Sequence, residues 1–195
     1  MQRRTYAELD RRARKIAAHL VEGSGGALLL YPPGLDFVDA LFGCLYAGRP
    51  AIPVYPPDPL NLARTLPRLL HIVADARPGR ILSTSAIAGV MASQAAVSPG
   101  MWDRPILATD DLPDAEPMQA SRQEVLPCTL AILQYTSGST RAPRGVMLTQ
   151  SNLVANSKYI AAAFQHDESS RGVIWLPPYH DMGLIGGILQ PVFVG

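Results

Sequence analysis

The sequence is poor in features that would mark several classes of protein. Only two cysteines occur, Cys44 and Cys128, and they lie far apart. Neither a disulfide scaffold nor a zinc site is therefore expected, and a reducing compartment is favoured. Positive and negative charges nearly cancel, which leaves a formal net charge of +1. Because binding to nucleic acid usually needs an excess of positive charge, bulk electrostatics give no support for a nucleic-acid partner.

Long apolar runs are also missing. No stretch approaches the length of a membrane-spanning helix, and the arginines at positions 3 and 4 are not followed by the apolar core of a signal peptide. We therefore expect a cytoplasmic protein without a membrane span. The 195 residues are 48% hydrophobic and 17% charged, which is enough for one sizeable domain, or for a domain and part of another.

Short apolar runs alternate with helical patterns along the first half of the chain. Continuous apolar runs are typical of buried parallel strands, and residues 27–31 form such a run. We expect further strands at residues 51–55 and 80–84. Apolar residues at helical spacing between these runs predict helices, which cover residues 5–20, 35–45, 60–75 and 85–95. This alternation predicts an α/β fold with a doubly wound, mainly parallel sheet.

The first predicted helix combines a start signal with many basic residues. Thr5 and Glu8 have the spacing of a capping box. The pairs Glu8–Arg12 and Asp10–Arg14 have the i,i+4 spacing of helix ion pairs. A solvated, salt-bridged face is therefore favoured over an anion-binding site.

The composition divides the chain into three parts. Residues 1–96 form an N-terminal α/β sub-structure, and residues 97–128, rich in Pro, Asp, Glu and Gln, form an exposed connection with a possible strand at 104–108. Residues 129–195 form a second sub-structure of the same domain. In this last part we expect strands at 129–135, 145–148 and 173–176, and a helix capped by Thr149 that extends to Phe164.

A hydroxyl-rich loop follows the strand at 129–135. It reads Thr136-Ser137-Gly138-Ser139-Thr140, and Arg141 and Arg144 come shortly after. Hydroxyl and backbone N–H donors in series, with a glycine that lets the backbone close on a ligand, suit a polyphosphate. The loop is not a Walker A motif, because Gly138 and Gly145 are seven positions apart. The alternative is an ordinary turn, since each of these residue types is common in turns.

The second chemical motif is Leu176-Pro177-Pro178-Tyr179-His180-Asp181-Met182-Gly183-Leu184. A histidine beside an aspartate, directly after a predicted strand, is placed to line a cleft at the carboxyl edge of the sheet. The alternative is a histidine that only caps the following helix or is satisfied in the core.

Together these segments resemble the adenylate-forming superfamily, which includes acyl-CoA synthetases and AMP-binding enzymes. Its loop has the form T-S-G-[ST]-T-G-x-P-K-G, and here Arg141 replaces the second glycine and Arg144 the lysine. The form Ser-Thr-Arg-x-Pro, with L-P-x-Y-H-D-M-G-L, is similar to the fatty acyl-AMP ligase branch. The resemblance runs from about Thr5 to Gly195. Members of the branch are much longer, so it implies the N-terminal part of such an enzyme.

The resemblance implies a reaction in which a fatty acid carboxylate attacks the α-phosphorus of ATP. Acyl-AMP and pyrophosphate form, and the acyl group then passes to the thiol of an acyl carrier protein or a synthase carrier domain. Mg²⁺ would assist, with its usual glutamate ligand outside this chain. His180 would lie near the reacting carboxylate and α-phosphate, and Asp181 would orient either its imidazole ring or the adjacent helix. The residues expected to bind the phosphates are Thr136, Ser137, Gly138, Ser139, Thr140 and Arg144.

Three alternatives stay open beside the ligase. They are an acyl-CoA synthetase, a loading module of a polyketide or nonribosomal synthase, and an inactive nucleotide-binding remnant. Because the resemblance places other nucleotide contacts downstream of Gly195, we expect the 195 residues alone to have no ligase activity.

Overall fold

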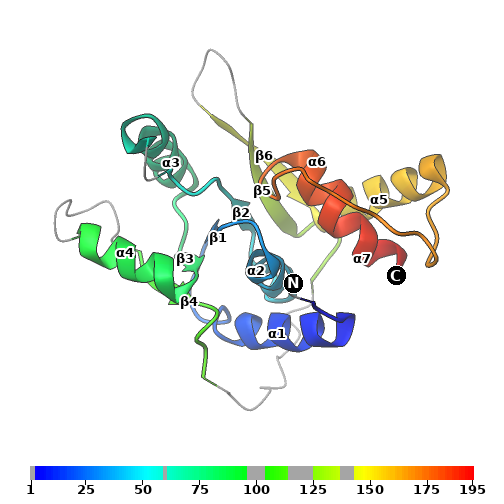
Figure 1. Ribbon diagram of the computed structural model, residues 1–195, viewed down its shortest axis with the longest axis horizontal. Coiled ribbons are helices and arrows are strands. Elements are labelled where there is room, and N and C mark those ends of the chain that lie inside the picture. Colours follow the sequence, from blue (N-terminus) through cyan, green and yellow to red (C-terminus); the bar gives the residue numbers. More distant parts are fainter. Residues whose placement is uncertain (1–2, 59–60, 96–103, 114–124, 137–142) are drawn as a thin grey trace.

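A computed structural model describes residues 3–58, 61–95, 104–113, 125–136 and 143–195 (Figure 1). The strands are β1 (Ala27–Leu30), β2 (Ala51–Pro53), β3 (Arg80–Ser83), β4 (Ile106–Ala108), β5 (Leu130–Thr136) and β6 (Arg144–Thr149). The longer helices are α1 (Tyr6–Ala18), α2 (Leu35–Tyr46), α3 (Leu62–Ala76), α4 (Ser85–Ala95) and α5 (Gln150–Phe164). Near residue 195 the chain forms α6 (Asp181–Leu184), the π-helical segment η2 (Ile185–Leu189) and α7 (Gln190–Val194).

The six strands form one sheet in the order β4-β3-β1-β2-β5-β6. Neighbouring strands are parallel except for β5 and β6, which form an antiparallel pair. The predicted doubly wound, mainly parallel sheet is therefore confirmed. The strand expected at 104–108 is present as β4, at the edge of the sheet. The division of the chain into sub-structures stays a prediction. The two larger parts, residues 1–96 and 129–195, meet where β2 pairs with β5.

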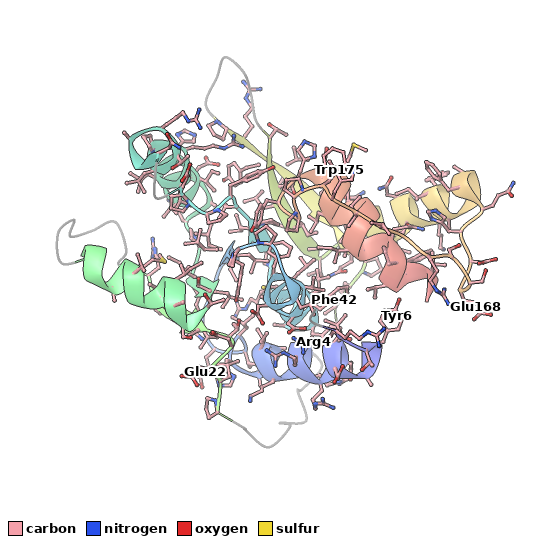
Figure 2. The ribbon with its side chains drawn as sticks, viewed as in Figure 1. Arg4, Tyr6, Glu22, Phe42, Glu168 and Trp175 are labelled. Atoms are coloured by element: carbon pink, nitrogen blue, oxygen red, sulfur yellow. The ribbon has the colours of Figure 1, made fainter. Side chains whose placement is uncertain are left out.

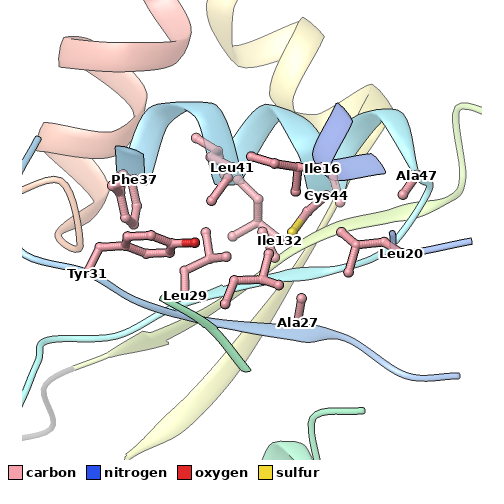
Figure 3. Packing of buried hydrophobic residues seen from close by; sticks show 14 of the residues in the cluster. Ile16, Leu20, Ala27, Leu29, Tyr31, Phe37, Leu41, Cys44, Ala47 and Ile132 are labelled. Carbon is pink, nitrogen blue, oxygen red and sulfur yellow. The ribbon is translucent and has the colours of Figure 1, made fainter. Parts of the chain in front are cut away.

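Helices cover both faces of the sheet because the strands are apolar on both sides. Ala27 and Leu29 of β1 face a core cluster that includes residues of α1 and α2, as Figure 3 shows. Leu28 and Leu30 face the opposite cluster, to which α3 and α4 contribute Leu69 and other residues. Burying a side chain such as leucine stabilises the fold by about 1.5–3 kcal/mol, so both layers hold the sheet in place.

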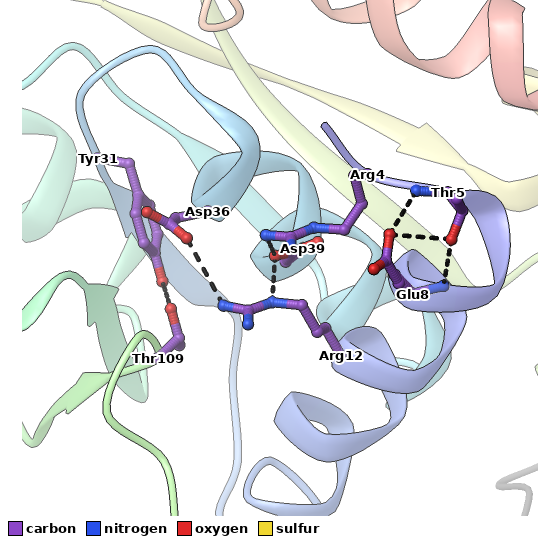
Figure 4. A network of polar contacts seen from close by, with 8 residues as sticks. All are labelled: Arg4, Thr5, Glu8, Arg12, Tyr31, Asp36, Asp39 and Thr109. Carbon is purple, nitrogen blue, oxygen red and sulfur yellow. Dashed lines mark hydrogen bonds and ion pairs between the residues drawn. The ribbon is translucent and has the colours of Figure 1, made fainter. Parts of the chain in front are cut away.

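Helix α1 begins as predicted, but one of its expected ion pairs is replaced. The capping box between Thr5 and Glu8 is formed, and Arg14 donates to Asp10 at 2.8 Å. Arg12 does not pair with Glu8, whose carboxylate accepts hydrogen bonds from Thr5. Arg12 instead contacts Asp39 of α2, with its Nε 2.6 Å from the Asp39 Oδ2 (Figure 4). The buried Asp39 carboxylate needs cationic partners, and this need outweighs the local i,i+4 pairing.

The strand predicted for 173–176 is wrong. This segment has no strand conformation, and Val173 and Trp175 are 98% and 86% exposed; Trp175 is labelled in Figure 2. Among the described residues no strand lies beside it, and a strand forms only where a neighbour accepts and donates its backbone hydrogen bonds. Within the same described ranges, no helix has the length and apolar character needed to cross a bilayer.

Candidate functional site

A cavity of about 570 Å³ opens beyond the carboxyl ends of β2 and β5. The chain passes from β1 to β2 through α2 and then returns to the other side of β1 through α3. Open α/β sheets usually bind their ligands in such a crevice beyond the carboxyl ends of the strands. The lining residues come from the end of β2, from α3, from the end of β5 and from 179–181.

Tyr179 holds the His180 segment against the sheet. Its ring packs edge-on against Phe37, with centroids 5.4 Å apart, and at a tilt against Tyr55 at 4.9 Å. Its hydroxyl donates to the backbone carbonyl of Tyr31, and its own carbonyl accepts a hydrogen bond from Gln134 Nε2 at 2.8 Å. Tyr179 is thus attached to the end of β1 through its hydroxyl and to β5 through its carbonyl, which brings the next residue in the chain to the cavity.

His180 and Asp181 form a close pair at the cavity wall. His180 Nδ1 lies 2.5 Å from Asp181 Oδ1, and both side chains are more than half exposed. The Met182 N–H lies 3.4 Å from the same Nδ1 but only 2.7 Å from Asp181 Oδ1. His180 Nδ1 is thus occupied at the start of α6, where it accepts from the Met182 N–H and caps the helix, as the alternative reading of this histidine expected. Nε2 of His180 therefore remains available to a ligand.

The predicted phosphate loop is described only at its start. Thr136, the last residue of β5, lines the cavity together with His180 and Asp181. Ser137, Gly138, Ser139 and Thr140 lie outside the described residues. The strand–loop–strand arrangement predicted around them is confirmed, since Thr136 pairs with Arg144 across β5 and β6.

Arg144 does not join the group of residues that line this cavity. It is exposed at the start of β6, and it is absent from the cavity walls formed by the described residues. The structure thus brings Thr136, His180 and Asp181 to one place and leaves Arg144 on the neighbouring strand.

The segment after His180 is a packed helix. Leu184 and Leu189 are buried in the α1–α2 core cluster. At Gly183 a Cβ atom would lie 2.1 Å from the carbonyl oxygen of Pro177, so only glycine allows the helix to approach the chain before it so closely.

Sequence reasoning missed several residues of the site. Gln134 and Tyr179 position the His180 segment, and Arg64 and Arg68 of α3 line the cavity. Two patterns in the sequence could have indicated Gln134 and the two arginines. Gln134 is a polar residue inside an otherwise apolar strand, and the two arginines are four residues apart on one helix face.

The chain is similar in sequence to two kinds of fatty-acid ligase. JamA of Moorena producens, a medium-chain-fatty-acid acyl-carrier-protein ligase, is 44% identical over 98% of this chain and 33% of its own length. The long-chain-fatty-acid AMP ligase FadD32 of Mycolicibacterium smegmatis is 37% identical over 96% of this chain and 30% of its own. The chain thus spans about a third of the length of these relatives.

A solved structure gives the same result at the level of the fold. The fatty acyl-adenylate ligase of L. pneumophila, in complex with acyl adenylate and pyrophosphate, superposes with a TM-score of 0.87 at 36% identity. It covers the whole of this chain, which corresponds to 33% of that protein. The model of the AMP-binding enzyme family matches residues 1–195, and the chain therefore belongs to this family.

Proposed function

We propose that this chain is part of a fatty acyl-AMP ligase, which activates a fatty acid with ATP to acyl-AMP in the cytoplasm. One observation carries the proposal: Thr136 and the His180–Asp181 pair line a single cavity at the carboxyl edge of the sheet. The membership of the AMP-binding family supports it, as do relatives whose names describe fatty-acid ligases.

The residues in the cavity suit nucleotidyl transfer, which depends on positioning the reactants and on neutralising phosphate charge. Thr136 and the loop that follows it would hold the outer phosphates of ATP. A fatty acid carboxylate is ionised at neutral pH, so His180 is not needed as a general base. His180 Nε2 would instead orient the carboxylate or the α-phosphate, while the close contact between Nδ1 and Asp181 sets the direction of the ring.

Mg²⁺ remains part of the proposal, but the described residues fit it only as a partner of ATP. No group of three metal-ligating side chains gathers among them, and Mg²⁺ in nucleotide sites takes much of its coordination from phosphates and water. When bound, it would neutralise charge on the phosphates. Of the two carboxylates in the cavity wall, Asp58 and Asp181, the second adjoins His180, beside which we place the α-phosphate.

The proposed acyl acceptor is the thiol of an acyl carrier protein or of a synthase carrier domain. JamA is by name an acyl-carrier-protein ligase, and Arg141 departs from the acyl-CoA synthetase form of the loop. A loading module has the same local chemistry, so a carrier domain encoded next to this chain would favour it. Transfer to free coenzyme A by the full-length gene product would favour the acyl-CoA synthetase.

Fatty-acid-dependent exchange of pyrophosphate into ATP, measured on the full-length gene product, tests the function directly. We expect exchange that needs both ATP and a fatty acid, and a loss of at least about tenfold in His180→Ala, equivalent to 1.4 kcal/mol. His166→Ala is the matched control, because His166 is exposed after α5, away from the cavity walls. Exchange that does not depend on fatty acid would refute the proposal, and no exchange at all would favour the inactive remnant.

The 195-residue chain allows a second measurement. We expect it to form no acyl hydroxamate from ATP, fatty acid and hydroxylamine above background. Hydroxamate formation by this chain alone would show that the residues downstream in its relatives are not required.

A further inference from the structure

Two arginines of α3 bring positive charge into the cavity without a carboxylate partner. Arg64 and Arg68 are one helical turn apart and line the cavity opposite Thr136 and His180. Arg64 is exposed and Arg68 half-buried. Among the described residues, neither guanidinium takes part in an ion pair or a hydrogen bond. An arginine with an open planar fork inside a cavity is suited to bind an oxyanion through two parallel N–H donors.

The acidic residues of the same cavity do not neutralise these arginines. The Asp58 carboxylate accepts a hydrogen bond from Asn61 at 2.6 Å, and Asp181 is engaged by His180 and by the Met182 N–H. Both carboxylates are thus engaged by other groups, and among the described residues neither forms an ion pair with Arg64 or Arg68.

Helix α3 is fixed relative to the start of the phosphate loop. The Tyr135 hydroxyl donates to Asp75 of α3 at 2.5 Å, and Leu69 and Ile72 pack in the same core cluster as Tyr135. Tyr135 directly precedes Thr136 in β5. The backbone positions that carry the two arginines and Thr136 are therefore fixed relative to one another, so that a ligand between them needs no movement of α3 against β5.

A third observation points to a ligand at this place. Gln134 also lines the cavity and is only 8% exposed. Its Nε2 donates to Tyr179, but its buried Oε1 has no hydrogen-bond partner. Buried polar atoms are almost always paired in native proteins, so an unpaired one is explained by a missing partner. A ligand that carries an N–H or O–H group near its phosphate would supply that partner.

We propose that Arg64 and Arg68 bind a phosphate group in this cavity and form a cationic wall opposite Thr136. The proposal deepens the proposed function and rests on it for the identity of the ligand. Two sources have the required chemistry: the polyphosphate tail of ATP, which leaves as pyrophosphate, and the phosphodiester of a carrier's phosphopantetheine arm. Both place a charged phosphate beside groups that can donate to Gln134.

Isothermal titration of the 195-residue chain with inorganic pyrophosphate and with 4′-phosphopantetheine tests the proposal. We expect the double variant R64Q/R68Q to bind one of these probes at least about tenfold more weakly, since each lost charge-assisted hydrogen bond has that order of effect. R64K/R68K keeps the charge but not the fork, so its loss should be smaller. Binding by the unchanged chain should also weaken as salt is added.

Arg11→Gln is the matched control, because Arg11 is exposed on α1 and is not part of the cavity wall. A selective loss of pyrophosphate binding identifies the polyphosphate as the source, and a selective loss of phosphopantetheine binding identifies the carrier arm. The proposal is overturned if the unchanged chain binds neither probe, if R64Q/R68Q binds both as tightly as before, or if R11Q causes an equal loss. Circular dichroism checks that each variant is folded. If R64Q/R68Q does not fold, the loss of probe binding is measured on R64K/R68K instead.

These binding measurements need no fatty acid, so they separate this inference from the proposed function. Arginine-dependent phosphate binding without fatty-acid-dependent exchange would refute the ligase and keep the phosphate site. Exchange in a full-length R64Q/R68Q variant with unchanged KM values for ATP and for the carrier would keep the ligase and remove the arginines from its binding site.

Discussion

Replacing Tyr179 by phenylalanine should destabilise the fold measurably, although only one oxygen atom is removed. Tyr179 is 4% exposed, and burial raises the pKa of its hydroxyl, so the group is protonated at any ordinary pH and acts as a donor. It donates to the carbonyl of Tyr31, itself fully buried. In Tyr179→Phe the ring contacts with Phe37 and Tyr55 are kept, and the carbonyl alone loses its partner.

The magnitude follows from that unpaired carbonyl. Leaving a buried acceptor without its hydrogen bond costs about 1–3 kcal/mol. For a domain of this size each kcal/mol lowers the melting temperature by about 2–4 °C, so a midpoint of about 2 kcal/mol corresponds to roughly 6 °C. Tyr179→Ala, which also removes the ring from the core, should cost about 3–5 kcal/mol. The difference between the two variants measures the contribution of the ring.

Urea unfolding followed by far-UV circular dichroism measures both free energies. The midpoint should fall while the slope stays constant, because the surface exposed on unfolding is unchanged. Tyr159→Phe is the control, since Tyr159 is 77% exposed on α5 and should stay within about 0.5 kcal/mol of the unchanged protein. The reasoning fails if Tyr179→Phe is as stable as that control.

Three further outcomes follow from other parts of the structure. In the folded protein one thiol should react with an aromatic disulfide reagent and two in denaturant, because Cys128 is exposed whereas burial raises the pKa of Cys44 to about 12; two reactive thiols without denaturant would contradict this. Gly183→Ala should lower the free energy of unfolding by about 1–3 kcal/mol, since its Cβ would lie 2.1 Å from a backbone carbonyl oxygen, whereas Gly89→Ala, with open space around the new atom, should not destabilise. Partial burial raises the pKa of Asp110, but hydrogen bonds from Ser85 outweigh this and hold the pKa below its ordinary value. The stability that this shift contributes is present above the unfolded pKa and is lost as pH falls through the folded pKa. Asp110→Asn should therefore lose less folding stability between about pH 5 and pH 2 than the unchanged protein, as measured by acid unfolding curves.

The elements that the sequence predicted well are those whose causes are local. The capping box at Thr5 and the helix cap at Thr149 are visible as short patterns in the sequence, and both are formed. The run at 27–31 predicted a buried strand because residues on both faces are apolar, and β1 is buried throughout. The prediction of a strand at 173–176 is wrong because an apolar run indicates burial only where a neighbouring element covers it, and Val173 is almost fully exposed.

In the candidate site, too, residues in local motifs were predicted and residues that depend on distant segments were not. His180, Asp181 and Thr136 were identified from motifs, and the structure places them at one cavity. Arg64 and Arg68 were not identified, because they lie about 70 residues or more before the loop and nothing in their own helix indicates a phosphate. Arg144 follows the loop closely in sequence, yet the antiparallel pairing of β5 and β6 keeps it outside the cavity wall.

The sequence by itself determined the alternation of strands and helices, the two motifs and the family they resemble, because hydrophobic period, caps and short motifs depend on residues close together in the chain. Only the tertiary structure decided which residues share the cavity. The order of strands in the sheet brings the ends of β2 and β5 together and places α3 across from them. That order depends on packing between distant segments, which no local pattern records.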